Sequence, residues 1–553
     1  MKTTYSLPDK YFRYLRSLFS RRVHKGPLSD ISFQKALCAV LSGVMLSASF
    51  PPGNLDWLAW IALVPLLVII KNERPLSAFK LGMIAGLSHY ATLVYWVIVA
   101  ANVYGGIGLF TSFGILLLFC FYLSLYPAFF SLMVNLMRNH LFMTITIPCI
   151  WVSLEYVRAV LITGFPWCLL GYSQFNMLAL IQISDITGVY GVSFLIVAVN
   201  VSIYMLLFRK GQTSDKRTRI FEISTVAVLL LLAYLYGVYR ISDTNKEDRD
   251  KQGNSLITSV IQGNIDQSLK WEPTLTSSTV NKYIALTKST MDSKPGLIVW
   301  PEAATPFFFQ EDAEFSEEIR RAVYESGAYL IFGSPAYQRE ASLIKYYNRV
   351  YLLDPKGASA GYYDKIHLVP FGEYVPLRRF IPFINRMVMS TEDFSPGDRQ
   401  RLLKMSDITA GALVCYEAVV PELARGEIEN GANILINLSN DAWFGMTSAP
   451  YQFLAMCVFR AVENRRPLIR AANTGFSAFI DPSGSITARS GLFMDDVLTG
   501  EIRKDFNRIT FYAKFGDMFA YLIIIICLIK FSHELWYHPI KKKRQLQKNQ
   551  KAS

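Results

Sequence analysis

The sequence predicts a membrane α-helical bundle of about eight spans, with a separate α/β domain inserted before the last span. Of the 553 residues, 52% are hydrophobic and only 18% are charged, whereas an average soluble protein carries about 25% charged residues. No Asp, Glu, Lys or Arg occurs from Leu81 to Met137. Beyond residue 250 the composition changes, and charged, glycine and proline residues mix as they do in soluble domains. These observations exclude a soluble enzyme, a disordered chain and a small disulfide scaffold.

The membrane part is divided into apolar stretches. Each is near the length of about 20 residues that a spanning helix needs. In chain order they are 33–50, 56–70, 81–98, 109–136, 141–160, 189–208, 221–239 and 515–532. No cleavable signal peptide is expected, because the chain begins with a long basic and polar stretch. The predicted parts are a tail at 1–30, seven spans at 31–240, an inserted domain at 250–510, a last span at 514–534 and a tail at 535–553.

The positive charges are concentrated beside the apolar stretches. Seven Lys and Arg residues lie in 1–30, five in Arg209–Arg219 and six from Lys541 onward, within a net charge of +13. The long connection Leu161–Gly188 has none. Basic residues flanking spans mark the cytoplasmic side of a membrane. We therefore expect both termini in the cytoplasm, the inserted domain on the outer face of the cytoplasmic membrane, and no nucleic acid as a partner.

The inserted domain alternates short apolar runs with helical segments. The expected strands are 256–262, 296–300, 329–333, 410–415 and 433–438, and the clearest helices are 314–326 and 452–465. Strands that alternate with helices predict a layered α/β domain. The seven cysteines are scattered without a CxxC pair, and no GxGxxG, P-loop or HExxH motif occurs, so we expect neither a metal nor another cofactor.

Three side chains of this domain are of types that take part in catalysis. Glu302 ends the tripeptide WPE, which follows the apolar run 297–299 directly, a position where burial favours a general base. Cys415 lies where another apolar run ends, and a thiol with a nearby base is a strong nucleophile. Lys365 lies in an aromatic segment and is able to stabilise an oxyanion. Taken singly, each has a structural interpretation: a loop carboxylate, a buried core cysteine, and a solvated lysine paired with Asp364.

Taken together and in this order, Glu302, Lys365 and Cys415 resemble the catalytic residues of the nitrilase superfamily of carbon–nitrogen hydrolases. The matching motifs are WPE at 300–302, DK at 364–365, CYE at 415–417 and NDAWFG at 440–445. The resemblance implies an α-β-β-α sandwich, and a thioester formed on Cys415.

The flanking spans narrow the resemblance to the bacterial apolipoprotein N-acyltransferase family. The further motifs similar to that family are WVSLEYVR at 151–158, FPW at 165–167, QGN at 262–264 followed by Lys270-Trp271, and HLVPFGEYVPL at 367–377. The resemblance assigns supporting or substrate-binding roles to Trp271, Glu373, Tyr416, Glu417 and Trp443. It also implies the partners, namely a phospholipid acyl donor, a diacylated lipoprotein acceptor and the bilayer of the bacterial inner membrane, with the catalytic domain facing the periplasm.

A thioester suits this reaction because it divides the transfer of an acyl chain from an ester to an amine into two easier displacements. Glu302 would take the proton of Cys415, return it to the leaving glycerol oxygen and then deprotonate the amine. Lys365 would stabilise the oxyanion, and Glu373 would hold Lys365 or Glu302 in place. The alternatives are a membrane-tethered amidase that passes its acyl group to water, and a transporter with an inactive outer domain.

Two further expectations concern the lipid. The apolar segments Phe307–Phe309 and Phe380–Met389 are predicted to reach the outer leaflet, although both could instead pack on the protein. Glu155 and Arg158 lie three residues apart in an apolar stretch, where ionisable residues are functional candidates. Their spacing favours an i,i+3 ion pair, with a functional role as the alternative.

Overall fold

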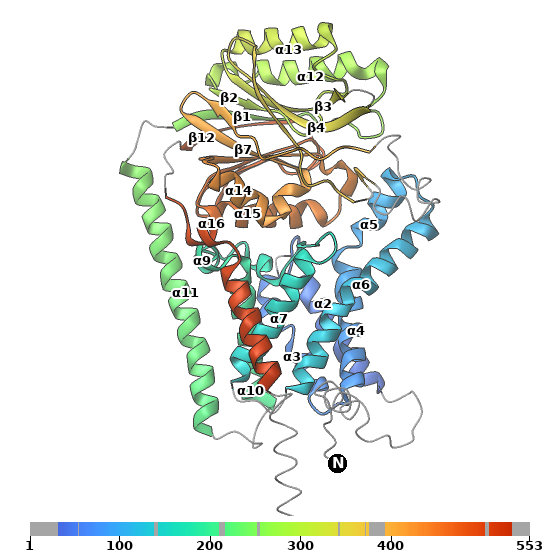
Figure 1. Ribbon diagram of the computed structural model, residues 1–553, viewed down its shortest axis with the longest axis vertical. Coiled ribbons are helices and arrows are strands. Elements are labelled where there is room, and N and C mark those ends of the chain that lie inside the picture. Colours follow the sequence, from blue (N-terminus) through green and yellow to red (C-terminus); the bar gives the residue numbers. More distant parts are fainter. Residues whose placement is uncertain are drawn as a thin grey trace, which may run out of the picture.

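The computed structural model describes residues 31–53, 55–137, 142–208, 216–250, 255–340, 343–370, 372–374, 393–503 and 508–533. A helical bundle forms one end of the molecule and a two-sheet sandwich lies on top of it (Figure 1). The sandwich is formed by residues between α11 and the last apolar helix, as the change in composition predicts. The two tails and Phe380–Met389 lie outside the described residues.

The bundle has fewer full-length spans than predicted. In the described part of the chain, four helices are long and apolar enough to cross a membrane. They are α6 (Leu109–Leu136), α7 (Met143–Val160), α10 (Val189–Phe208) and most of α11 (Lys216–Asp250). The pair formed by α4 (Pro75–Leu93) and Trp96–Tyr104 makes a fifth if it is counted as one span, and it is bent by 52°. The predicted count of eight is not confirmed.

The remaining apolar stretches form shorter helices. These are α2 (Phe33–Ala48) and the helix Met518–His533. The stretch 56–70 is broken into the 3₁₀ helix η1 (Asp56–Trp60) and α3 (Val64–Ile70). Pro65 lies in the first turn of α3, where its missing N–H and fixed φ suit a helix start and prevent a continuous helix through this point. Hydropathy alone could not separate this broken segment from a span.

The connection 161–188 is not an exposed loop. It contains η3 (Leu170–Gln174), α8 (Leu178–Ile181) and α9 (Ser184–Thr187). Every residue from Pro166 to Gln174 is buried. This connection therefore belongs to the packed junction between the bundle and the sandwich.

Two six-stranded sheets form the sandwich. The first has the order β12 (Asp496–Arg503), β1 (Ser255–Gln262), β2 (Leu297–Val299), β3 (Tyr329–Glu340), β4 (Leu343–Leu353), β5 (Ser359–Asp364). The second has the order β11 (Ile486–Arg489), β10 (Ala478–Ile480), β9 (Leu468–Ala472), β8 (Ile434–Ser439), β7 (Ile408–Val414), β6 (Leu403–Met405). The central strands β1, β2 and β3 are parallel, and so are β7, β8 and β9.

Helices cover both outer faces of the sandwich, which gives the predicted α-β-β-α layers. Helices α12 (Thr276–Lys288) and α13 (Ala313–Ser326) lie on the first sheet, and α14 (Pro421–Glu429) and α15 (Ala449–Asn464) lie between the second sheet and the bundle (Figure 1). The five predicted strands correspond to β1, β2, β3, β7 and β8, and the two predicted helices to α13 and α15.

The alternation of side chains along each strand explains both cores of the sandwich. Leu297 and Val299 of β2 lie between the sheets, whereas Ile298 packs toward α12 and α13. In β8, Ile436 lies between the sheets and Leu435 belongs to the core shared with the bundle. Successive residues of a strand point to opposite faces, so strands covered on both faces are apolar throughout.

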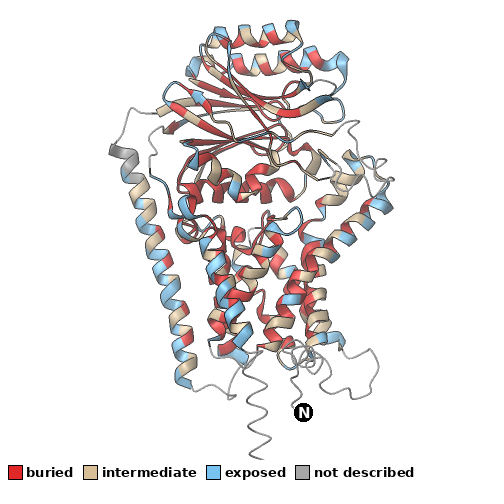
Figure 2. Cartoon of the chain, viewed as in Figure 1, coloured by how far each residue is buried: buried red, intermediate tan, exposed pale blue. Residues whose placement is uncertain are grey.

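The sandwich and the bundle share one continuous core. In α15, every residue except Tyr451 is buried, although this helix lies on the outside of the sandwich (Figure 2). Ion pairs cross or line the junction: Arg465 binds Asp185 at 2.8 Å, and Arg460 binds Glu463 at 2.9 Å and the Tyr172 hydroxyl at 2.8 Å. A buried, hydrogen-bonded junction of this kind fixes the orientation of the sandwich on the bundle.

Candidate active site

Glu302, Lys365 and Cys415 each lie just beyond the carboxyl end of a strand. Glu302 follows β2 by three residues, Lys365 follows β5 directly, and Cys415 follows β7 directly. The first two come from one sheet and the third from the other. The strand ends therefore bring residues far apart in the sequence to the same edge of the sandwich.

Lys365 is the centre of a buried charge cluster. Its side chain is 1% exposed, and its Nζ lies 2.8 Å from Oε2 of Glu373 and 3.7 Å from Oε1 of Glu302. Burial disfavours the ammonium, but the charges of Glu373 and Glu302 outweigh burial and raise the pKa of Lys365. Lys365 is therefore a fixed positive charge at neutral pH. The alternative interpretation of a solvated lysine paired with Asp364 does not apply, because Lys365 is buried and Asp364 binds Arg349 at 2.7 Å.

Asn348 in β4 joins the two carboxylates of this cluster. Its Nδ2 donates to Oε1 of Glu302 at 2.8 Å and to Oε1 of Glu373 at 3.0 Å. The main-chain N–H of Val369 donates to the other oxygen of Glu373 at 2.9 Å. Glu373 is thus held on both oxygens, whereas one oxygen of Glu302 remains available for proton transfer.

Cys415 occupies a strained turn between β7 and η7 (Cys415–Val419). Its φ is +52°, in the left-handed region that costs free energy for a residue with a side chain. Asn437 in β8 donates to the Cys415 carbonyl at 3.2 Å and so helps hold this conformation. Burial and the charge of Glu302 raise the pKa of the thiol, and Lys365 opposes them. The resting side chain is therefore a thiol within electrostatic reach of both residues.

Glu417 connects this turn to the segment that carries Lys365. Its carboxylate accepts hydrogen bonds from the main-chain N–H groups of Val414 at 2.7 Å, Ile366 at 2.8 Å and His367 at 3.0 Å. The Tyr363 hydroxyl adds a fourth at 2.9 Å. With its acceptor capacity filled and the side chain fully buried, Glu417 fixes the Cys415 turn relative to the segment of Lys365 and is not free to exchange a proton.

Tyr416 extends the site to the bundle. Its ring stacks on His367 with 5.8 Å between the centroids, and on Trp167 of the connection 161–188 with 6.3 Å. Trp167 is fully buried, and its Nε1 donates to Oε1 of Gln452 in α15 at 2.8 Å. The residue after Cys415 therefore contacts the membrane part of the chain directly.

Comparison with known proteins identifies the family of this chain. Residues 42–202 match the apolipoprotein N-acyltransferase N-terminal domain, and residues 257–510 match the carbon–nitrogen hydrolase family. The apolipoprotein N-acyltransferase of Geobacter metallireducens is 40% identical over 94% of this chain and 99% of its own length. The chain belongs to the apolipoprotein N-acyltransferase family. The enzymes of that name from Methylococcus capsulatus and Pasteurella multocida are 32% and 30% identical over 87% and 89% of this chain, and over 92% and 94% of their own lengths.

Two tryptophans to which the family resemblance assigned supporting roles lie outside the charge cluster. Trp443 in η8 (Asp441–Phe444) packs edge-on against Tyr104 of the bundle, with 6.1 Å between the centroids. Trp271 is 50% exposed and makes no hydrogen bond or ring contact with the other described site residues. The supporting roles of these two tryptophans therefore remain predictions.

Glu155 and Arg158 of α7 do not form the predicted i,i+3 ion pair. The Glu155 carboxylate accepts from the main-chain N–H of Leu170 at 2.7 Å, and Arg158 donates to the carbonyl oxygens of Trp167 at 3.1 Å and Cys168 at 3.5 Å. Both charged groups thus hold the main chain of the segment that presents Trp167 to Tyr416.

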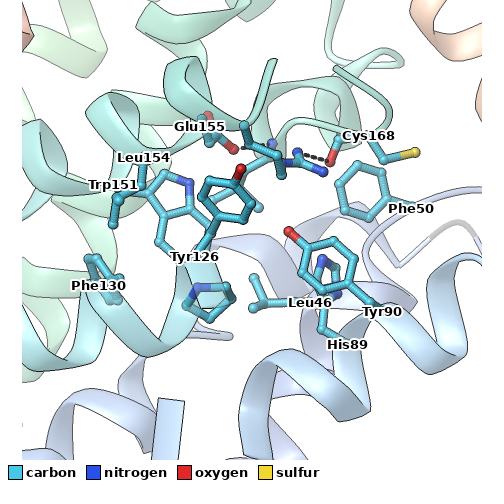
Figure 3. Close-up of a pocket in the computed structure, with 13 residues that line it drawn as sticks. Leu46, Phe50, His89, Tyr90, Tyr126, Phe130, Trp151, Leu154, Glu155 and Cys168 are labelled. Carbon is cyan, nitrogen blue, oxygen red and sulfur yellow. Dashed lines mark hydrogen bonds between the residues drawn. The ribbon is translucent and has the colours of Figure 1, made fainter. Parts of the chain in front are cut away.

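A small cavity lies beneath this segment, inside the bundle. Glu155, His89, Tyr90 and Tyr126 line it (Figure 3), and its volume is about 30 Å³. A cavity of that size holds a few water molecules at most and no acyl chain. Within the described ranges, no group of three His, Cys, Asp or Glu side chains is arranged to hold a metal ion.

The prediction that Phe307–Phe309 reach the lipid is wrong. Phe309 is buried against Phe332 and Tyr351, Phe308 packs on Tyr337, and Phe307 packs on Phe315. Phe307 and Phe309 belong to the core between the first sheet and helices α12 and α13. Phe308 lies against tyrosines of β3 and β4. An apolar triplet after a strand is as suitable for a core as for a membrane contact.

Two residues that contact Glu302 could not be identified from the sequence, namely Asn348 and Lys270. Asn348 lies inside an aromatic strand, where a single amide gives no signal of its contacts. Lys270 is 2% exposed, and its Nζ donates to the carbonyl oxygen of Glu302 at 3.4 Å. The only available signal was its position beside Trp271 after the QGN motif.

Proposed function

We propose that this protein transfers an acyl chain from a membrane phospholipid, through a thioester on Cys415, to the N-terminal α-amine of an S-diacylglyceryl-cysteine lipoprotein. Family membership supports the reaction class. The observation that carries the assignment of residues is the buried cluster of Glu302, Lys365 and Glu373 at the same strand-end edge as Cys415, against the membrane part of the chain.

The first displacement forms the thioester. Glu302 takes the proton of Cys415 as the sulfur attacks the ester carbonyl, because the raised pKa of the thiol leaves little thiolate in the resting enzyme. The Lys365 ammonium stabilises the oxygen of the tetrahedral intermediate. When the intermediate collapses, the C–O bond breaks, the glycerol oxygen takes the proton from Glu302, and a lysophospholipid leaves.

The second displacement uses the same groups. The α-amine of the acceptor, whose ordinary pKa is about 8, attacks the thioester in its neutral form. Glu302 takes the proton that the nitrogen loses, and the C–S bond breaks. The sulfur then takes this proton from Glu302, and the amide product leaves. Glu373, Asn348 and Glu417 hold Lys365, Glu302 and the Cys415 turn in position throughout both steps.

The location follows from the same proposal. We place the protein in the bacterial inner membrane, with the catalytic domain in the periplasm and both termini in the cytoplasm. The support is the concentration of Lys and Arg in residues 1–30, in Arg209–Arg219 and beyond Lys541, together with their absence from Leu161–Gly188.

Two measurements test this function. The purified protein is incubated with a labelled phospholipid, and intact mass should then show one acyl group that hydroxylamine removes and that Cys415→Ala lacks. Adding a diacylated lipopeptide should transfer the label to the peptide amine. Release of free fatty acid without any triacylated peptide would identify a hydrolase instead, and full activity of Cys415→Ala would exclude both enzymes.

A further inference from the structure

The proposed cluster contains more negative than positive charge. Lys365 is the single ammonium between the carboxylates of Glu302 and Glu373, so the three ionised groups carry one net negative charge. Glu302 is 7% exposed, and the Lys365 side chain is 1% exposed. An excess of negative charge in such a site opposes the loss of a proton from Cys415.

Lys270 is a second buried lysine at this site. Its Nζ donates to the main-chain carbonyl of Glu302, and among the described residues no carboxylate oxygen lies within 4 Å of it. Burial lowers the pKa of Lys270 to about 8, and the charge of Glu302 opposes this shift. The side chain is therefore mainly an ammonium at neutral pH and brings the sum of the four charges to zero.

The loop that carries Lys270 is fixed across the two sheets. Asn473 accepts from the main-chain N–H of Ile265 at 2.8 Å and donates to its carbonyl at 2.8 Å. Asn440 donates to the side chain of Gln267 at 2.7 Å. Lys270 therefore approaches Glu302 from a segment that is held independently of Lys365 and Glu373.

The other titratable groups facing the cluster have partners of their own or are neutral. Glu417 accepts four hydrogen bonds, Asp441 binds Arg470 at 2.6 Å, and Cys415 is a thiol at rest. Burial and the charge of Lys365 lower the pKa of His367, so that it is neutral near pH 7. None of these groups supplies the missing positive charge.

We propose that Lys270 is a positioning residue for Glu302, whose ammonium holds the Glu302 main chain and supplies the cluster with a second positive charge. This inference rests on the proposed role of Glu302. It assigns a function to a buried lysine that makes no described hydrogen bond to Cys415.

The test compares Lys270→Met, Lys270→Gln and Lys270→Arg in the full-length protein in detergent. The rate of acyl-enzyme formation from a fluorescent phospholipid is measured from pH 5 to 9, and so is the rate of Cys415 alkylation by iodoacetamide. The Met and Gln variants remove a positive charge from the site, and a site with less positive charge releases protons only at higher pH. In these two variants we therefore expect both pH profiles to move up by about one pH unit. Lys270→Arg should keep both profiles near those of the native protein.

The control is Lys282→Met, which removes a partly exposed lysine paired with Asp495 and should change neither profile. If Lys270→Met does not fold, Lys270→Gln decides the result, because it removes the charge while keeping an N–H donor on a somewhat shorter side chain. Unshifted profiles in the neutral variants would overturn the inference. Acyl labelling that persists in Cys415→Ala would instead refute the proposed function, whatever the Lys270 variants show.

Discussion

Trp167 of the membrane part lies parallel to Tyr416 of the catalytic domain, with 6.3 Å between the ring centroids and 11° between the planes. Tyr416 stacks in turn on His367 at 17°, and Trp167 on Phe165 at 12°. Four nearly parallel rings thus cross the junction beside the nucleophile. We infer that the bundle orients the Cys415 turn as well as anchoring the domain.

Replacing Trp167 should therefore slow acylation without abolishing it. An aromatic pair contributes about 0.5–1.5 kcal/mol beyond its buried area, so Trp167→Ala should reduce the rate of acyl-enzyme formation up to about tenfold. Trp167→Phe keeps a ring and should retain most of the rate. The control is Trp57→Ala, at a side chain that is 57% exposed. A native rate in Trp167→Ala, measured with a fluorescent phospholipid, would show that the stack does not orient the nucleophile.

Glu417→Gln should affect both stability and activity. The carboxylate accepts four hydrogen bonds, and a glutamine of the same shape has only one acceptor oxygen. An unpaired buried donor costs about 1–3 kcal/mol, so we expect a lower thermal unfolding temperature and a much slower acylation. Glu429→Gln, at an exposed carboxylate of α14, serves as the matched control. If Glu417→Gln were active with native stability, its positioning role would be wrong.

Much of the fold was predictable because the periodicity of apolar residues and the length of apolar stretches are local properties of the sequence. The buried strand β2 is apolar on both faces, and the charge-free stretch before Met137 contains the long helix α6. The broken segment 56–70 was not predictable, because hydropathy does not register a 3₁₀ turn followed by Pro65. Likewise, sequence order suggested that Glu155 and Arg158 pair with each other, whereas both bind the main chain of a segment that folds back onto α7.

The residues of the proposed site also fall into two groups, those that could be identified from the sequence and those that could not. Glu302, Lys365 and Cys415 were identified because each ends an apolar run and lies in a recognisable motif. Asn348 and Lys270 were not, because their importance arises only when β4 and the loop after β1 meet the end of β2 in space. The preference of Lys365 for Glu373 over its neighbour Asp364 also depends on Arg349, which comes from an adjacent strand.

The junction between the domains should depend on Asp185. This carboxylate binds Arg465 at 2.8 Å, Arg240 at 3.1 Å and the Tyr236 hydroxyl at 2.8 Å. Asp185→Ala would leave two arginines without their shared counter-charge, and breaking a buried pair costs about 3–5 kcal/mol. We expect a marked fall in the thermal unfolding temperature in detergent. Asp495→Ala, which removes an exposed partner of Lys282, should leave that temperature nearly unchanged. Equal stability of the two variants would contradict the prediction.

The proposed topology makes a separate prediction. A cysteine introduced at Glu317, on the exposed face of α13, should react with a membrane-impermeant maleimide in cells whose outer membrane has been made permeable. A cysteine at Ser553 should react only after the inner membrane is also opened. The native protein, with its seven cysteines, provides the background. The reverse pattern of labelling would place the catalytic domain in the cytoplasm.

The last prediction concerns how the proposed triad divides its work. Cys415→Ser offers a hydroxyl of much higher pKa, so we expect no acyl-enzyme and no turnover, with the fold intact. Lys365→Ala removes the charge that stabilises the oxyanion, commonly worth about 3–4 kcal/mol, or roughly 100- to 1000-fold in rate. Glu302→Gln removes the proton acceptor of both displacements.

Lys365→Ala and Glu302→Gln should therefore each slow acyl-enzyme formation as well as transfer to the amine. The two rates are measured separately, by single-turnover labelling and by adding a lipopeptide to preformed acyl-enzyme. Suppose that Glu302→Gln formed the acyl-enzyme at the native rate and failed only with the amine. Glu302 would then not activate Cys415. Glu417 could not easily replace it, because its oxygens are occupied by four donors. Glu373 would be the remaining carboxylate, and it would first have to release its hydrogen bonds from Lys365 and Val369.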